Sequence, residues 1–361
     1  MIQVPCVYRF HHSGGHSSFS SVAQGFRPVG KALDRVHPLD WDPTDDSTRN
    51  PMRMPSTFRA SLAKLLLAVA AGIALCSCSA VKLAYNNLPE VGYWWLDGYV
   101  DFTGAQTPQV RDQLAQLLER HRRNELPKVL VLLDRAERLA PGDIAASQVC
   151  EFSDAIRDRL LAAALEASQS GAELAATLGD GQLRYLERKY AKVNADYAED
   201  WLDRSVDQQH RKRYDAFLDR SEDFYGTLDA GQRALLRDLV DRSIFDPRRI
   251  DAERRERQRE ALALLRRLGD GRTEVREGRA AIDAYARRVA QPPAGPWRDY
   301  QQALLAESCG NIAALHKATR PDQRERAARR LAAYAQDVRD LIARPSTPRP
   351  VTSPDPNAAV R

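Results

Sequence analysis

The sequence is poor in the residues and patterns that build β-sheets. Aromatic residues make up 7% of the chain, β-branched residues form no clusters, and no stretch alternates apolar and polar residues for long. Half-buried strands show such alternation, so its absence argues against a sheet. Alanine, leucine, arginine, glutamate and glutamine, which favour helices, are abundant instead. The sequence therefore predicts an all-α protein, either a multi-helix bundle or an extended helical array.

A strong charge of one sign is also lacking. Residues 1–77 hold 8 of the 54 basic and 5 of the 49 acidic residues, which leaves the remainder near +2. The densest basic run, residues 248–259, is interleaved with acids, as is typical of a solvated helix face. A nucleic-acid binder shows a stripe of one sign, so no nucleic-acid partner is expected. Binding of this run to acidic lipid phosphates is left open.

Familiar catalytic and cofactor motifs are missing. The sequence has no Gly-x-Ser-x-Gly elbow, no phosphate-binding loop, no His-Glu-x-x-His pair and no dinucleotide fingerprint. His121 and Glu125 have a spacing that suits a metal on a helix, but no second pair of ligands is near them in sequence. No metal, cofactor or catalytic residue is therefore expected.

One long hydrophobic run lies near the N-terminus. Residues 65–75 are eleven apolar residues, and Arg53, Arg59 and Lys64 precede them. A membrane-spanning helix needs about 20 apolar residues, whereas a shorter run behind basic residues is typical of a signal peptide. The alternatives are a buried helix of a soluble protein and the signal of a plain secreted protein.

The run ends in Leu75-Cys76-Ser77-Cys78, which resembles the lipobox of bacterial lipoproteins. The resemblance implies cleavage between Ser77 and Cys78 and attachment of lipid to Cys78. Cys76 fits less well, because bulky Leu75 would then lie directly before the cleaved bond. Ser79, where an aspartate favours retention in the inner membrane, implies the outer membrane, with the protein facing the periplasm.

These features divide the chain into four parts. Residues 1–51 lack periodicity and precede the signal, so they are interpreted as a mis-called translation start or as a disordered extension. Residues 52–77 are the predicted lipoprotein signal peptide, and residues 78–344 are the predicted helical domain. Residues 345–361 are rich in proline and are expected to form an unstructured tail.

The cysteines suggest one disulfide. Cys6 and Cys76 precede the predicted cut and Cys78 is the predicted lipid carrier, so Cys150 and Cys309 remain. Both lie in helical patterns, and an oxidising compartment favours a bridge between them. Such a bridge would close a loop of about 160 residues, worth roughly 4–5 kcal/mol by chain entropy. Two buried free thiols are the alternative.

The densest aromatic cluster directly follows the predicted anchor. Val91, Trp94, Trp95, Tyr99 and Phe102 recur at steps of three and four residues, which places them on one face of a helix. One interpretation is an aromatic belt at the lipid headgroups, where Trp and Tyr are favoured. The other is core packing against later helices.

Asp97 and Asp101 are four residues apart on the same helix and are therefore neighbours in space. Paired carboxylates can perform acid–base catalysis or bind a cation, although such acids more often pair with arginine or face water. These two acids are the basis of an alternative function as an envelope hydrolase. Together with Trp94, Trp95 and Tyr99 they are the candidate interaction residues.

Several patterns predict where helices begin and end. Thr103 with Gln106, Asp229 with Gln232, and residues 320–323 are cap-like, and Asp229 with Gln232 fits a capping box. They resemble the Leu-Thr-x-x-Gln repeats of small periplasmic helical chaperones, although capping alone accounts for them.

Further breaks are expected at two other points. Asp143 is expected to cap a helix. Gly179 is expected to end one helix in the left-handed conformation, and Asp180 to cap the next.

Two segments carry a resemblance to a family: Tyr85-Asn86-Asn87-Leu88-Pro89, and Trp94-Trp95-Leu96-Asp97-x-Tyr99-x-Asp101-Phe102. Directly behind a lipobox, they are similar to an uncharacterised proteobacterial lipoprotein family of unknown function, over roughly Cys78 to Arg344. The resemblance implies a helical, lipid-anchored envelope protein and brings no activity, cofactor or catalytic residue.

The sequence thus favours a non-enzymatic scaffold or binding module. It would be tethered to a membrane by N-terminal lipid and would act on envelope proteins or the cell wall. A lipid or metabolite carrier is a further alternative to the hydrolase.

Overall fold

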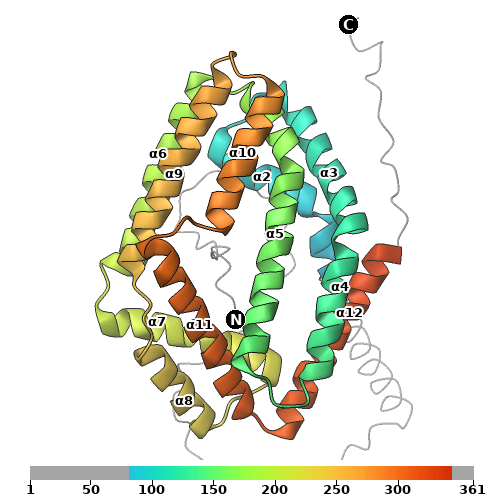
Figure 1. Ribbon diagram of the computed structural model, residues 1–361, viewed down its shortest axis with the longest axis vertical. Coiled ribbons are helices and arrows are strands. Elements are labelled where there is room, and N and C mark those ends of the chain that lie inside the picture. The colour runs from blue at the N-terminus through green and yellow to red at the C-terminus, as the bar shows by residue number, and fades with distance from the viewer. Residues whose placement is uncertain (1–80, 344–361) are drawn as a thin grey trace, which may run out of the picture. The chain divides into compact units, whose positions relative to one another are not determined.

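The computed structural model describes residues 81–343, which form helices joined by short connections, without a β-strand (Figure 1). The prediction of an all-α protein is therefore confirmed for this part of the chain. The predicted extension, the signal peptide, the cleavage and lipidation site at Ser77 and Cys78, and the tail at 345–361 lie outside the described residues. Among the described helices, none combines the length and the apolar character needed to cross a bilayer.

A helical segment at residues 81–86 precedes the named helices of the described chain. Proline stands in the first turn of α2, α4, α9 and α11, where its missing N–H leaves no bond unmade. The bounds are α2 Leu88–Val100, α3 Gln106–Asn124, α4 Leu126–Leu139, α5 Ala146–Ala175, α6 Asp180–Tyr197, the π-helical turn η1 Ala198–Leu202, α7 Val206–Tyr225, α8 Ala230–Asp241, α9 Pro247–Gly269, α10 Val275–Ala290, α11 Pro296–Lys317 and α12 Pro321–Ala343.

Helix α5 supports two later helices. α10 packs along one stretch of α5 and α11 along another (Figure 1). The helices approach closely at α10 because small residues meet there: a Cβ atom on Gly278 would lie 3.3 Å from the Cβ of Ala172. Elsewhere α12 packs along α4, α2 contacts α3 and α6, and α7 contacts α8 and α12.

The buried core of the described residues is divided among separate clusters. One joins the start of α4 to the end of α12, where Leu126 packs with Val338 and Leu341. Another joins α8 and α11 through Leu236 and Leu315. The described helices therefore bury their apolar stripes in separate clusters, and no single central core holds this part of the chain together.

A disulfide joins α5 to α11. Cys150 and Cys309 are bonded through their sulfur atoms, with their Cα atoms 5.5 Å apart, and they are separated by 159 residues in sequence. Cys309 is almost fully buried. This is the pair that remains in the sequence once the cysteines at and before the predicted cut are set aside.

The predicted capping box at the start of α8 is present. The Gln232 N–H donates to Asp229 Oδ1 (2.9 Å), and the Asp229 N–H donates to Gln232 Oε1 (3.0 Å). The same glutamine also reaches further: its Nε2 donates to Gln323 Oε1 (2.7 Å), and Gln323 Nε2 donates back to Gln232 Oε1 (3.1 Å). Gln323 likewise accepts from the Arg320 N–H before α12 (3.0 Å). Two helix starts are thus locked together by one glutamine pair.

The same arrangement occurs between α3 and α6. Gln106 accepts from the Thr103 N–H (3.0 Å) and Gln182 from the Gly179 N–H (3.2 Å). The two side chains bond each other, with Gln182 Nε2 2.8 Å from Gln106 Oε1. Each amide also donates to a backbone carbonyl beside its partner's cap, Gln106 to Thr177 and Gln182 to Asp101. One geometry therefore links four helix starts in two pairs.

Three predicted details of the helix ends are wrong. Gly179 is extended (φ −88°) and is itself the N-cap of α6, while Asp180 is already the first helical residue. Asp143 does not cap α5, which begins three residues later behind Ala145, where Gln148 accepts the backbone N–H. Asp143 instead forms an ion pair with Arg324 of α12 (2.7 Å). In both places a glutamine side chain does the capping that was assigned to an aspartate.

Candidate functional site

Helix α2 turns an apolar face to solvent. One turn of an α-helix is 3.6 residues, so side chains three and four apart share a face. On this face the exposed fractions are 46% for Leu88, 59% for Val91, 64% for Trp94 and 56% for Trp95. We call these four residues the apolar face of α2. Core packing of the two tryptophans, one of the two interpretations of the sequence, is therefore wrong.

The opposite side of α2 holds the helix to the protein. Tyr93 is buried with Phe102 and Val110, and its hydroxyl lies 3.0 Å from Thr107 Oγ1. Phe102 was expected on the same face as the tryptophans. It lies in this core instead, because α2 ends at Val100 and the chain turns before it reaches Phe102.

Aromatic rings and cations border the apolar face. Trp95 packs on Tyr99, with ring centroids 4.9 Å apart, and Lys189 Nζ lies 5.2 Å from the Tyr99 ring. On the other border, the Arg111 guanidinium lies 5.7 Å from the Trp94 ring. Cations placed beside half-exposed aromatic rings suit a surface where apolar and anionic groups adjoin.

Asp97 and Asp101 end helix α2. Asp97 Oδ1 accepts the backbone N–H of Phe102 (2.9 Å), and the Asp101 N–H donates to the Asp97 carbonyl (2.8 Å). Asp101 is left-handed (φ 57°), a conformation that aspartate tolerates better than most residues. The Asp101 carbonyl also accepts from Gln182 (3.0 Å). The two acids therefore have a structural role in the turn after α2, and neither lines the cavity between α7, α8 and α11.

The side chains of His121 and Glu125 make their hydrogen bonds to other residues and not to each other. The Tyr85 hydroxyl lies 2.9 Å from His121 Nδ1. The nearly buried Glu125 carboxylate accepts from Lys128 (2.7 Å) and Arg159 (3.1 Å). Burial alone would raise the pKa of Glu125, but these two cations lower it on balance. Within residues 81–343, no three His, Cys, Asp or Glu side chains gather as a metal site would require.

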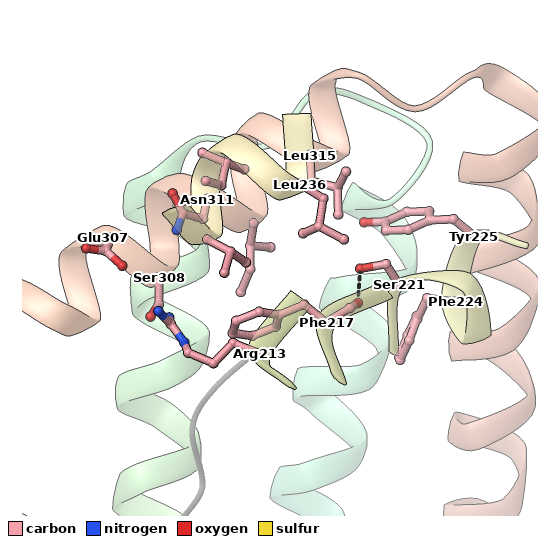
Figure 2. A pocket seen from close by; sticks show the side chains of 13 residues that line it. Arg213, Phe217, Ser221, Phe224, Tyr225, Leu236, Glu307, Ser308, Asn311 and Leu315 are labelled. Atoms are coloured by element: carbon pink, nitrogen blue, oxygen red, sulfur yellow. Dashed lines mark hydrogen bonds between the residues drawn. The ribbon is translucent and has the colours of Figure 1, made fainter. Parts of the chain in front are cut away.

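A cavity of about 300 Å³ lies between α7, α8 and α11 (Figure 2). Phe217, Phe224 and Leu236 contribute to its apolar wall, and Arg213, Ser308 and Asn311 form a polar end. Sequence reasoning missed this site. Its residues come from three helices and form no local motif, although an arginine one turn before a phenylalanine, Arg213 and Phe217, is a weak signal.

The described chain is thus an all-α, disulfide-bonded protein with an exposed apolar helix face and one largely apolar cavity. It matches the model of the "Family of unknown function (DUF6279)" over residues 98–276, from the last turn of α2 to the start of α10. This agrees with the expected resemblance to an uncharacterised family, although the motif at 85–89 and the first half of the motif at 94–102 precede the matched range. Searches of curated proteins and of solved structures found no match.

Proposed function

We propose that this chain is a lipid-anchored protein of the cell envelope whose helical body is a non-enzymatic binding module or scaffold. In this proposal lipid on Cys78 and the apolar face of α2 hold the protein on the periplasmic side of the outer membrane. Its partners would be envelope proteins or the cell wall.

The observation that carries the proposal is that the apolar face of α2 follows Cys78 closely in the sequence. Leu88 follows Cys78 by ten residues, and helix is already present from residue 81. Three extended residues span at most about 11 Å, so lipid on Cys78 would keep the start of this helix near the bilayer surface. Exposed Trp side chains are favoured at that depth, and a contiguous exposed apolar patch on a protein marks an interaction surface.

Two further features support the proposal. The disulfide between Cys150 and Cys309 suits an oxidising compartment such as the periplasm. Arg111 lies beside the Trp94 ring and Lys189 beside the Tyr99 ring, so both cations are placed to meet lipid phosphates when the apolar face enters the bilayer surface. Arg111 also pairs with Glu90 (2.5 Å).

Quenching of tryptophan fluorescence by brominated lipid tests this placement. The protein is purified after expression of the full-length sequence. It is then reconstituted into vesicles that contain phosphatidylcholine with bromine on the upper acyl carbons. We expect quenching in the wild type and its loss in the double variant Trp94→Phe/Trp95→Phe. The matched control is Trp201→Phe/Trp297→Phe, which removes the other two described tryptophans and should keep the quenching.

Each outcome of this experiment is informative. Quenching that survives in Trp94→Phe/Trp95→Phe and disappears in the control would place a different surface on the membrane. Absence of quenching in vesicle-bound wild type would mean that lipid alone tethers the protein and that the apolar face binds something else.

A further inference from the structure

Arg213 is a buried cation at the polar end of the cavity. Its side chain is on α7, and the whole residue is 7% exposed. The Nη2 atom donates to Ser243 Oγ (2.9 Å), and the guanidinium carbon lies 4.4 Å from the Phe245 ring centroid. Its Nε is buried and has no hydrogen-bond partner. The Nη1 atom also makes no hydrogen bond to the described residues and, unlike Nε, is not closed off by its neighbours, so the guanidinium keeps a donor for a partner in the cavity.

The nearest acid does not supply that partner. Glu307 accepts the Ser243 hydroxyl and the Ile244 N–H (2.8 Å), so its charge is already stabilised by two donors. No ion pair within 4.0 Å joins Arg213 to a carboxylate in the described part of the chain. The Asn311 side-chain amide, on the same end of the cavity, makes no hydrogen bond to the described residues. Two polar groups thus face the cavity with capacity left for a ligand (Figure 2).

The rest of the wall is hydrocarbon. Phe217 and Phe224 from α7, Leu236 and Val240 from α8, and Leu315 from α11 surround the space beyond the polar end. The Tyr225 hydroxyl at the far end lies 2.9 Å from His316 Nδ1, and the Ser221 hydroxyl donates to the Phe217 carbonyl (2.7 Å). Those polar groups are therefore satisfied internally, and the cavity offers hydrogen bonds at one end only.

We infer that this cavity binds a single-chain apolar carboxylate, the chemical class of a medium-chain fatty acid. Its carboxylate accepts from the Arg213 guanidinium, at Nη1, and from Asn311 Nδ2, and its chain lies against Phe217, Leu236 and Leu315. At about 30 Å³ for each water-sized group, 300 Å³ holds roughly ten non-hydrogen atoms. A carboxylate is preferred to a neutral acceptor because charge-assisted hydrogen bonds to a buried guanidinium are the stronger ones. The inference does not depend on lipidation of Cys78.

The test uses decanoate labelled with ¹³C at its carboxyl carbon. It is added to the full-length product in lipid nanodiscs, with protein-free nanodiscs as the blank. We expect a saturable carboxyl resonance of one equivalent that is absent from the blank. Arg213→Lys should weaken binding roughly 10- to 100-fold, because an ammonium group cannot reproduce the planar set of donors that a guanidinium presents. Decanol, used as a competitor, should displace decanoate poorly.

A second variant keeps the test decisive if Arg213 variants fail to fold. Ile312→Phe adds a ring inside the cavity and should abolish the bound resonance. The matched control Val131→Phe adds the same group at a residue of α4 that is 64% exposed, and it should bind as the wild type does. Absence of the resonance in the wild type, or its persistence in Ile312→Phe, overturns the site. Displacement by decanol as effective as by unlabelled decanoate overturns the carboxylate class.

Discussion

At the scale of single residues, burial sets the protonation of the histidine that joins α11 to the loop before α5. His316 Nε2 lies 2.8 Å from the Gly142 carbonyl, which can only accept, so Nε2 carries the proton. Nδ1 is then free to accept from the Tyr225 hydroxyl. Burial raises the pKa of Tyr225 to about 12, so this donor keeps its proton. Burial also lowers the pKa of His316, more than the bond to Gly142 raises it.

This histidine gives a pH dependence with a definite sign. In the unfolded chain its pKa is near 6.5, and in the folded protein it is lower, so the unfolded state binds more protons between those values. The contribution of His316 to the free energy of unfolding is therefore fully present above about pH 6.5. It is lost as the pH falls from 6.5 through the lower pKa of the folded state. The slope from one histidine is at most about 1.4 kcal/mol per pH unit.

Urea denaturation between pH 7.5 and 5.5 measures this slope. His316→Gln keeps a donor for the Gly142 carbonyl but cannot take up a proton, so it should reduce the slope. An unchanged slope in His316→Gln would assign the pH dependence to other groups, such as His121, whose pKa burial also lowers.

The aromatic cluster shows how far single residues could be predicted. Spacing alone correctly placed Trp94, Trp95 and Val91 on one face. It could not decide between core and surface, because exposure depends on which side of α2 meets α3 and α6. It also misplaced Phe102, because one left-handed residue, Asp101, redirects the chain.

At the scale of elements, glutamines connect helix starts that are far apart in sequence. Gln232 and Gln323 are 91 residues apart, and each is almost fully buried. A cap pattern in the sequence predicts that such a glutamine bonds its own helix start. It carries no signal for the second partner, because that contact depends on tertiary packing. The sequence therefore revealed neither glutamine pair, although it predicted three of the four helix caps to which these glutamines belong.

A double-mutant cycle tests the coupling between these helix starts. Gln232→Ala and Gln323→Ala should each lower the free energy of unfolding by about 1–3 kcal/mol, because each leaves buried donors and acceptors unpaired. The double variant should cost less than their sum by about 1 kcal/mol. The control cycle pairs Gln232→Ala with Gln106→Ala, which share no partner, and should be additive. Additivity in the first cycle would show that the two caps act independently.

At the scale of the whole molecule, the interactions that hold the described helices together are spread over separate clusters and one disulfide. The clusters at α4–α12 and α8–α11 are separate, and the disulfide ties α5 to α11, a helix of the second cluster. The sequence predicted the helices, and it left one pair of cysteines as the candidates for a disulfide. It could not predict the cavity, because three helices must first assemble before Arg213 and Asn311 come together.

Removal of the disulfide tests this distribution. In Cys150→Ser/Cys309→Ser the free energy of unfolding should fall by about 2–5 kcal/mol, because the unfolded chain loses a long cross-linked loop. Urea denaturation compares the variant with the oxidised wild type. Addition of reductant to the wild type is the control and should bring its midpoint to that of the variant. Equal midpoints before reduction would mean that the bridge adds no stability.

Everything proposed about location depends on the chemical state of Cys78, and intact-mass spectrometry of the protein extracted from cell membranes measures it directly. The account predicts a mature chain that begins at Cys78 and carries the added mass of a diacylglyceryl group and an acyl chain. A chain that retains residues 52–77, or one with an unmodified thiol at Cys78, would contradict it.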